Sequence, residues 1–180
     1  MPKTCDRKCA GTLIPHPEHP DWFLMFERNT PPVGLAFPTG HIDTHGSPVE
    51  TARIEPQEEV GVDPTGLREV LSLWLPNRCR RQPGPAPYGH QWTVFQADGF
   101  TGDPKESDRE AKNMRWVNQE MFATHTRRTT HHAYGDVSAE DFAECPGLEP
   151  AWCRLLHEMG MLALTQQELE AVESLYVQAP

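Results

Sequence analysis

The 180-residue sequence lacks any run of about 18 consecutive apolar residues, so it offers no candidate for a membrane-spanning helix. Its first residues, MPKTCDRKCAGTLIPHPEH, also lack the apolar core of a secretory signal, and we therefore expect a cytoplasmic protein that does not act at a membrane. Cysteine is scarce as well. The five cysteines are an odd number, which favours reduced thiols over a disulfide scaffold.

Basic residues are too few to balance the acidic ones. The chain has 16 Lys and Arg against 26 Asp and Glu, a formal net charge of −10. Nucleic acid is therefore not an expected partner, because affinity for a phosphate backbone needs clustered Lys and Arg. Much of the acidity lies in residues 140–180, where Arg154 is the one basic residue. Any phosphate chemistry would need a local basic patch or a metal ion.

Proline is abundant, at 18 residues, and it is scattered along the chain as turn punctuation. Between these turns, short apolar runs predict β-strands at residues 11–15, 22–27, 33–37, 70–75, 91–97 and 114–117. A helix is predicted over Pro48–Val60, because Ser47 is a good N-cap, Pro48 suits the first helical position and Gly61 suits the end. Strands on both sides of one early helix indicate the α+β class.

The rest of the chain is read as loops followed by helices. Residues 98–113 and 124–134 are polar and show no clear periodicity, so we expect loops there, the second a candidate lid. Helix starts are predicted near Ser138, Pro150 and Thr165. We expect one domain over residues 1–135 and a helical C-terminal segment over residues 136–180 that packs on the same domain.

Three carboxylates in the predicted helix carry the strongest chemical signal. Glu55, Glu58 and Glu59 have i, i+3 and i+4 spacing, which places them within an arc of about 100° on one helix face. Like charges so close repel one another unless a cation lies between them. Clustered carboxylate oxygens suit a hard divalent cation, although spacing alone also fits a solvated acidic face.

With its flanks, the segment GHIDTHGSPVETARIEPQEEVGV at residues 40–62 resembles the Nudix box, G-x5-E-x7-R-E-U-x-E-E-x-G-U, in which U is bulky and aliphatic. Gly40 takes the first position, Glu55 the glutamate of R-E, and Glu58 and Glu59 the E-E pair. Gly61 and Val62 close the motif. The preceding residues 37–43 look like the strand and turn that lead into the box, and the similarity extends over roughly residues 10–120.

Three positions depart from this pattern. Gly46 replaces the first box glutamate, and Ile54 replaces the arginine that orients the catalytic glutamate in the family. Pro56 replaces an aliphatic residue inside the helix, where proline removes a backbone hydrogen bond and crowds the carbonyl of Ala52. We therefore expect this helix to kink or shift. A catalytically impaired or purely binding module of the same fold is the alternative that these changes keep open.

The resemblance implies an α/β/α sandwich with a mixed β-sheet and a helical C-terminal extension. It also implies a Mg2+ (or Mn2+)-dependent hydrolase that cleaves the diphosphate bond of a nucleoside diphosphate linked to another moiety. Gly40, Glu55, Glu58 and Glu59 would bind the metal, and the three glutamates would be catalytic. A further base often lies outside the box, and Glu110 is the candidate here, with Glu106 as a neighbour in the same polar stretch.

A basic cluster after the fourth predicted strand suits the phosphates. Arg78, Arg80 and Arg81 lie within four residues, and guanidinium groups bind phosphate oxygens well. His90 and Trp92 alternate on the next strand and are candidates for the wall of a base or sugar pocket. We therefore assign these five residues to substrate binding, while Trp92 also fits a place in the core. The expected partner is a small nucleotide-type molecule, and a homodimer is left open.

Zinc is the remaining cofactor that the sequence suggests. Cys5 and Cys9, with His16 and His19 nearby, resemble one half of a site, and Cys79 with His90 would form another. Structural zinc sites usually show two tight ligand pairs, and this sequence has only one such Cys pair. An N-terminal segment without a metal is therefore the alternative, and whether Cys5 and Cys9 or Cys79 and His90 bind zinc stays open.

Overall fold

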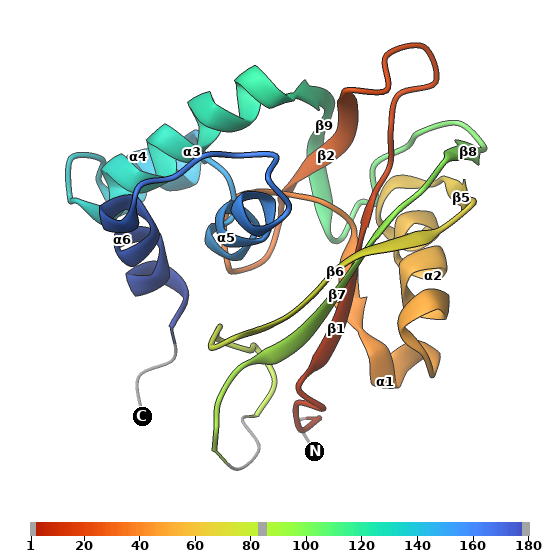
Figure 1. Cartoon of the computed structure of the whole chain (residues 1–180), viewed down its shortest axis with the longest axis horizontal. Coiled ribbons are helices and arrows are strands. Elements are labelled where there is room, and N and C mark those ends of the chain that lie inside the picture. Colours follow the sequence, from red (N-terminus) through yellow and green to blue (C-terminus); the bar gives the residue numbers. More distant parts are fainter. Residues whose placement is uncertain (1–2, 83–85, 178–180) are drawn as a thin grey trace.

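The computed structural model describes residues 3–82 and 86–177 and contains three β-sheets flanked by helices (Figure 1). The central sheet has the order β4-β1-β7-β6 and comprises β1 (Lys8–Leu13), β4 (Thr39–His41), β6 (Arg68–Leu75) and β7 (His90–Gln96). β1 and β7 are parallel and the other pairs are antiparallel, so the expected mixed sheet is confirmed. The smaller sheets are β3 (Leu35–Ala36), β2 (Trp22–Arg28) and β9 (Ala111–Asn118), and β5 (Asp63–Thr65) with β8 (Gly99–Thr101).

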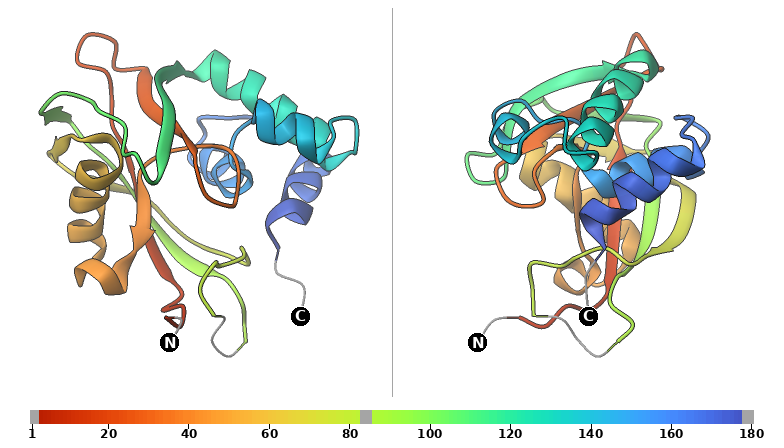
Figure 2. Two further views of the ribbon diagram at one scale, coloured as in Figure 1. Left: turned by 180° about the vertical axis from the view of Figure 1, so that it is seen from behind. Right: turned by 90° about the vertical axis from the view of Figure 1, so that its left-hand side faces the viewer.

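Helices cover both faces of the central sheet. α1 (Ile42–His45) and α2 (Pro48–Val60) lie on one side, and the helices that follow β9 lie on the other (Figures 1 and 2). The latter are α3 (Gln119–Ala133), α4 (Ala139–Glu144), α5 (Pro150–Glu158) and α6 (Gln166–Tyr176). The arrangement is the expected α/β/α sandwich. α4 to α6 begin close to the predicted starts because Ser138, Glu149 and Thr165 cap them, Thr165 through a complete capping box.

The side chains of β1 alternate between these two layers, as the period of a strand requires. Cys9 and Leu13 belong to the large core that includes the C-terminal helices, and Ala10 packs with Ala52 of α2. Gly11 faces the same side as Cys9. A Cβ there would lie 2.7 Å from the ring of Trp152 in α5, so glycine allows this helix to approach the sheet.

The C-terminal helices contribute a large part of that core. Trp152 makes edge contacts with Phe37 and Trp92, with ring centroids 4.7 and 5.6 Å apart. Val172 and Tyr176 of α6 are buried in the same cluster. This packing agrees with a C-terminal segment that lies on the domain, while the division at residue 135 stays a prediction.

α2 has the predicted bounds, and Pro56 does not interrupt it. The Ser47 side chain accepts the N–H of Glu50, and Gly61 ends the helix in the left-handed conformation. Pro56 has no N–H for the Ala52 carbonyl. The hydroxyl of Thr12 on β1 donates to that carbonyl instead, at 2.7 Å. A buried side chain of the sheet therefore replaces the hydrogen bond that proline removes.

We expect Thr12→Val to lower the free energy of unfolding by about 1–3 kcal/mol, the usual cost of an unsatisfied buried polar group. Valine has nearly the same shape, so the cavity term is small. Thr12→Ser keeps the hydroxyl and serves as the control. Denaturant unfolding of the three proteins measures the difference, and equal stabilities of the Val and Ser variants would show that the Ala52 carbonyl does not depend on Thr12.

The expectation of a loop at residues 124–134 is wrong, since this segment belongs to the long helix α3. Asn118 caps the helix by accepting the N–H of Met121. The buried face consists of Phe122, Thr126, Thr129 and Thr130, which have helical spacing but are mostly threonines. The periodicity of apolar residues therefore gave no signal. The polar stretch at 98–113 likewise contains β8 and the start of β9.

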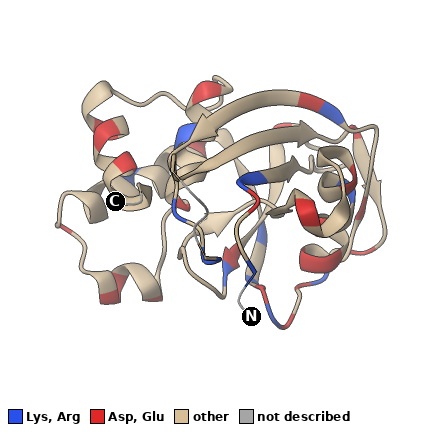
Figure 3. Cartoon of the chain, turned by 90° about the horizontal axis from the view of Figure 1, so that it is seen from below, with Lys and Arg blue, Asp and Glu red and all other residues tan. Residues whose placement is uncertain are grey.

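Acidic residues lie on the C-terminal helices and on α2, and others are spread over strands and loops between them (Figure 3). Within residues 3–82 and 86–177, no helix has the length and apolarity needed to cross a bilayer.

Candidate active site

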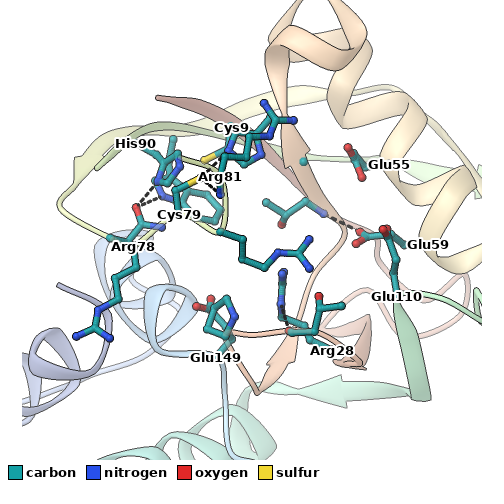
Figure 4. A pocket seen from close by; sticks show the side chains of 18 of the residues that line it. Cys9, Arg28, Glu55, Glu59, Arg78, Cys79, Arg81, His90, Glu110 and Glu149 are labelled. Carbon is teal, nitrogen blue, oxygen red and sulfur yellow. Dashed lines mark hydrogen bonds between the residues drawn. The ribbon is translucent and has the colours of Figure 1, made fainter. Parts of the chain in front are cut away.

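A cavity of about 380 Å3 lies where α2, β4, the loop after β6 and the residue before β9 meet. Its volume falls within the range of small-molecule sites, roughly 300–1,000 Å3. Its charged lining residues are Arg28, Glu55, Glu58, Glu59, Arg78, Arg80, Arg81, Glu110 and Glu149. In Figure 4, Glu55, Glu59 and Glu110 lie on one side of the cavity, and Cys79, His90 and Arg81 lie on the other.

Gly40 lies directly against the carboxylate of Glu55. A Cβ at residue 40 would be 1.5 Å from Glu55 Oε1 and 2.1 Å from its Cδ. The glycine is therefore required because any side chain would occupy the space of the carboxylate. β4 and α2 thus form a cradle that positions Glu55 against the backbone.

His45 contacts the same carboxylate from α1. Its Nε2 lies 3.0 Å from Glu55 Oε1 and 4.0 Å from Glu58 Oε2. Gly46 and Ile54 occupy the positions of the first glutamate and the orienting arginine of the Nudix box. Neither the glutamate nor the arginine is therefore present in this chain. His45 supplies a polar partner for Glu55 in its place. The sequence alone did not indicate this residue, since it has no counterpart in the box.

The three box glutamates differ in exposure. Glu55 and Glu59 are 8% and 4% exposed, while the Glu58 side chain is 57% exposed. Glu59 Oε2 accepts the N–H of Thr39 on β4 at 2.8 Å. Donor atoms of His45, Glu55 and Glu58 lie within 4.8 Å of one another, and Glu59 lies outside this group on the same side of the cavity.

Burial raises the pKa of both inner carboxyls. The pKa of Glu59 lies well above its ordinary value of 4.5, mainly by desolvation and then by the charge of Glu55. Desolvation also raises the pKa of Glu55, while the hydrogen bond from His45 opposes the shift. The charge of Glu110 also raises both pKa values. A cation between these groups would stabilise their charged forms.

This donor set fits a hard divalent cation. Carboxylate oxygens of Glu55 and Glu58 lie close together with His45. Glu59 and the Gly40 backbone lie beside them, and Glu55 and Glu59 are buried. Glu110 lines the same cavity, and its role as an additional base stays a prediction. Glu106 does not line it and instead accepts the N–H of Met114.

The three predicted arginines line the opposite wall but have different partners. Arg81 donates to Asp43 Oδ1 at 2.8 Å, and Arg78 donates to the carbonyl of Val177 at 2.9 Å. Arg80 has no hydrogen-bond or ion-pair partner within the described part of the chain. Arg80 is therefore the member of the cluster with a free guanidinium at the cavity.

His90 and Trp92 line the cavity but share a buried polar partner. Trp92 Nε1 donates to Asn77 Oδ1 at 3.1 Å, and His90 Nδ1 lies 3.0 Å from the same oxygen. His90 Nε2 lies 3.2 Å from the sulfur of Cys5. Burial lowers the pKa of His90 to about 4, so its ring is neutral at pH 7. Both ring nitrogens thus face protein atoms, and a role in substrate binding stays a prediction.

Two further charged residues of the cavity were not indicated by the sequence. Burial raises the pKa of both Glu59 and Glu149, and the charge of Arg28, at the end of β2, opposes both shifts. Glu149 is buried and caps α5 by accepting the N–H of Trp152 at 3.3 Å. Neither belongs to a recognisable motif, because the fold alone brings the end of β2 and the start of α5 to the cavity.

Solved structures of known proteins have a similar fold. MutT NUDIX hydrolase from Burkholderia pseudomallei has 18% identity and a TM-score of 0.50, with 66% of this chain and 85% of that chain covered. The MutT protein from Methanosarcina mazei has 19% identity and a TM-score of 0.50, with 67% and 81% covered. These similarities concern the fold. No curated protein matches the sequence.

The family comparison covers most of the chain and includes the whole segment 40–62. The model of the NUDIX domain matches residues 7–137, from the residue before β1 to the residue before the cap of α4. The chain therefore belongs to the NUDIX domain family.

Proposed function

We propose that the protein is a metal-dependent hydrolase that cleaves the diphosphate bond of a nucleoside diphosphate linked to another moiety. One observation carries this proposal: a single cavity has the carboxylates of α2 on one side and arginines on the other. A divalent cation held by carboxylates binds phosphate oxygens, and so do guanidinium groups. Family membership supports the same chemistry.

Glu55, Glu58, Glu59 and the Gly40 carbonyl would hold Mg2+ or Mn2+. When bound, the metal would neutralise phosphate charge and lower the pKa of a bound water. Arg80 and Arg28 would bind the phosphate oxygens, since both line the cavity and neither has a carboxylate partner at salt-bridge distance among the described residues. Glu110 would accept the proton of the attacking water.

His45 acts in this proposal as a positioning residue for Glu55. His45→Ala is expected to lower turnover or the apparent affinity for the activating metal by about 10–100-fold, the usual effect of losing a hydrogen bond to a ligating group. The steady-state rate as a function of Mn2+ concentration measures it. His131→Ala is the matched control, because that histidine is exposed on α3 and pairs with Asp136. A wild-type metal dependence in His45→Ala would remove His45 from the site.

The alternative is a Nudix-fold protein that binds its ligand without efficient turnover. The observation in its favour is the loss of both the first box glutamate and the box arginine, at Gly46 and Ile54. The contact between His45 and Glu55 argues against it, because the carboxylate still has a polar group that fixes its orientation.

A substrate panel separates the two. Nucleoside triphosphates, dinucleoside polyphosphates and nucleotide sugars would be incubated with the protein in the presence of Mg2+, Mn2+ or a chelator, with released products followed by chromatography. The hydrolase proposal expects metal-dependent cleavage of at least one class. Saturable binding of a panel member without cleavage under any metal condition would favour the binding module instead.

A further inference from the structure

A second cluster of possible metal ligands lies on the opposite wall of the cavity from α2. It consists of Cys5 before β1, His41 at the end of β4, Cys79 in the loop after β6 and His90 at the start of β7. One donor atom from each lies within 4.8 Å of the other three. The sequence suggested two separate sites, one with Cys5 and Cys9 and one with Cys79 and His90. The structure instead combines Cys5 with Cys79 and His90 in one cluster, and Cys9 lies outside it.

We propose that these four residues form a structural Zn2+ site. Two thiolates and two imidazoles form one of the standard four-ligand sets for this ion. The ion and two thiolates have no net charge together, which suits a largely buried location.

The distances between donor atoms fit a tetrahedral ion. His90 Nε2 lies 3.2 Å from Cys5 Sγ, His41 Nε2 lies 3.3 Å from Cys79 Sγ, and His41 Nε2 lies 3.7 Å from Cys5 Sγ. Zinc bonds of about 2.3 Å to sulfur and about 2.0–2.1 Å to nitrogen place tetrahedral ligands roughly 3.3–3.8 Å apart. The three Cys–His distances therefore lie close to this range, and all four donor atoms lie within 4.8 Å of one another.

The hydrogen bonds around His90 fix the tautomer that a metal requires. An indole N–H can only donate, so the Asn77 atom that faces Trp92 Nε1 is the amide oxygen. The same oxygen faces His90 Nδ1 at 3.0 Å, and this nitrogen must therefore carry the proton. His90 Nε2 is left with a free lone pair aimed at the cluster. Such support of a ligating histidine by a second residue is general in metal sites.

Both sulfurs also accept backbone hydrogen bonds of the same kind. The N–H of Arg7 donates to Cys5 Sγ, and the N–H of Arg81 donates to Cys79 Sγ, each at 3.3 Å. In both cases the donor follows the cysteine by two positions in the sequence. The backbone therefore holds both sulfurs in position. The N–H of Cys5 also donates to the carbonyl of Gln82, so the two cysteine-bearing segments are already joined.

The position of the site suggests what the ion does. His41 follows Gly40 of the carboxylate side, and Cys79 precedes Arg80 and Arg81 of the arginine side. Zinc would therefore fix the loop that carries Arg80 and Arg81 relative to β4. An effect of zinc on turnover rests on the proposed function, but the binding of zinc does not. Either proposal can therefore be wrong while the other holds.

Metal analysis of protein purified without a metal-affinity step tests the site. We expect one zinc per chain in the wild type and in Cys145→Ser, a control that changes an exposed cysteine. Cys79→Ser should lose zinc. Loss of a hydrogen bond that supports a ligand lowers metal affinity by roughly 10–100-fold, and loss of the ligand itself should lower the affinity for zinc by more than that. Because Cys79 lies half-buried in a loop, this variant should still fold, and circular dichroism checks it.

Cobalt substitution gives a spectroscopic test of the site in the wild-type protein. Co2+ in the wild type should show the intense visible absorption of a tetrahedral ion and thiolate charge-transfer bands. Glu58→Gln should retain both zinc and these bands. The proposal is overturned if reduced wild-type protein takes up no zinc after reconstitution, if Cys79→Ser and Cys145→Ser bind it equally, or if Co2+ shows no thiolate bands.

Discussion

Replacing Glu58 by Gln should lower turnover by at least about 100-fold, because a metal contributes several kcal/mol of charge stabilisation and each 1.4 kcal/mol is about tenfold in rate. The carboxylate lies in the donor group with His45 and Glu55. Its side chain is more than half exposed, so the substitution should not disturb the fold. The rate is measured on whichever panel substrate is cleaved, at saturating Mg2+ or Mn2+.

The matched control for Glu58→Gln is Glu50→Gln on the same helix. Glu50 pairs with Arg53 and does not line the cavity. The Glu50→Gln substitution therefore changes the charge of α2 by the same amount as Glu58→Gln and leaves the site intact. If both variants lose activity equally, the effect comes from helix charge and not from metal binding.

Gly40→Ala should be nearly as damaging, although it adds a single methyl group. That group would lie 1.5 Å from Glu55 Oε1, so the carboxylate or β4 must move. A displacement of about 1 Å at a catalytic group can cost about 100-fold in rate. Steady-state kinetics and thermal unfolding together measure the effect, since we expect a large loss of rate with a folded protein.

Gly99→Ala is the control for the added methyl group. Residue 99 lies in β8, and a Cβ there would meet its nearest neighbour, Thr65 Oγ1, at an ordinary 3.6 Å. This variant should retain wild-type activity. Full activity of Gly40→Ala would mean that Glu55 does not need its observed position against the β4 backbone.

Local signals explain what the sequence could predict. α2 was predicted to the residue because Ser47, Pro48 and Gly61 mark its ends by short-range chemistry. The resemblance of residues 40–62 to the Nudix box then gave the mixed sheet and the family, and both are confirmed. Glu55, Glu58 and Glu59 line one cavity, as their spacing on a helix face predicts.

The failures come from long-range contacts and from polar faces. α3 was missed because its buried side consists mainly of threonines. Continuity of α2 through Pro56 depends on Thr12, a residue of another element. Cys5, Cys79 and His90 were candidate zinc ligands in the sequence, but His41 and the combination of all four were missed, because the ligands come from four segments that only the sheet order brings together.

Binding of Mn2+ tests the central claim, that the carboxylates of α2 hold a divalent cation, most directly. Electron paramagnetic resonance can follow free Mn2+ during a titration of zinc-loaded wild type, Glu58→Gln and Glu50→Gln, without a known substrate. We predict saturable binding by the wild type and by Glu50→Gln, and binding at least about 10-fold weaker in Glu58→Gln, as expected when a group that holds or supports a metal is lost. Equal affinity in all three proteins, or no saturable binding in any, would contradict the account.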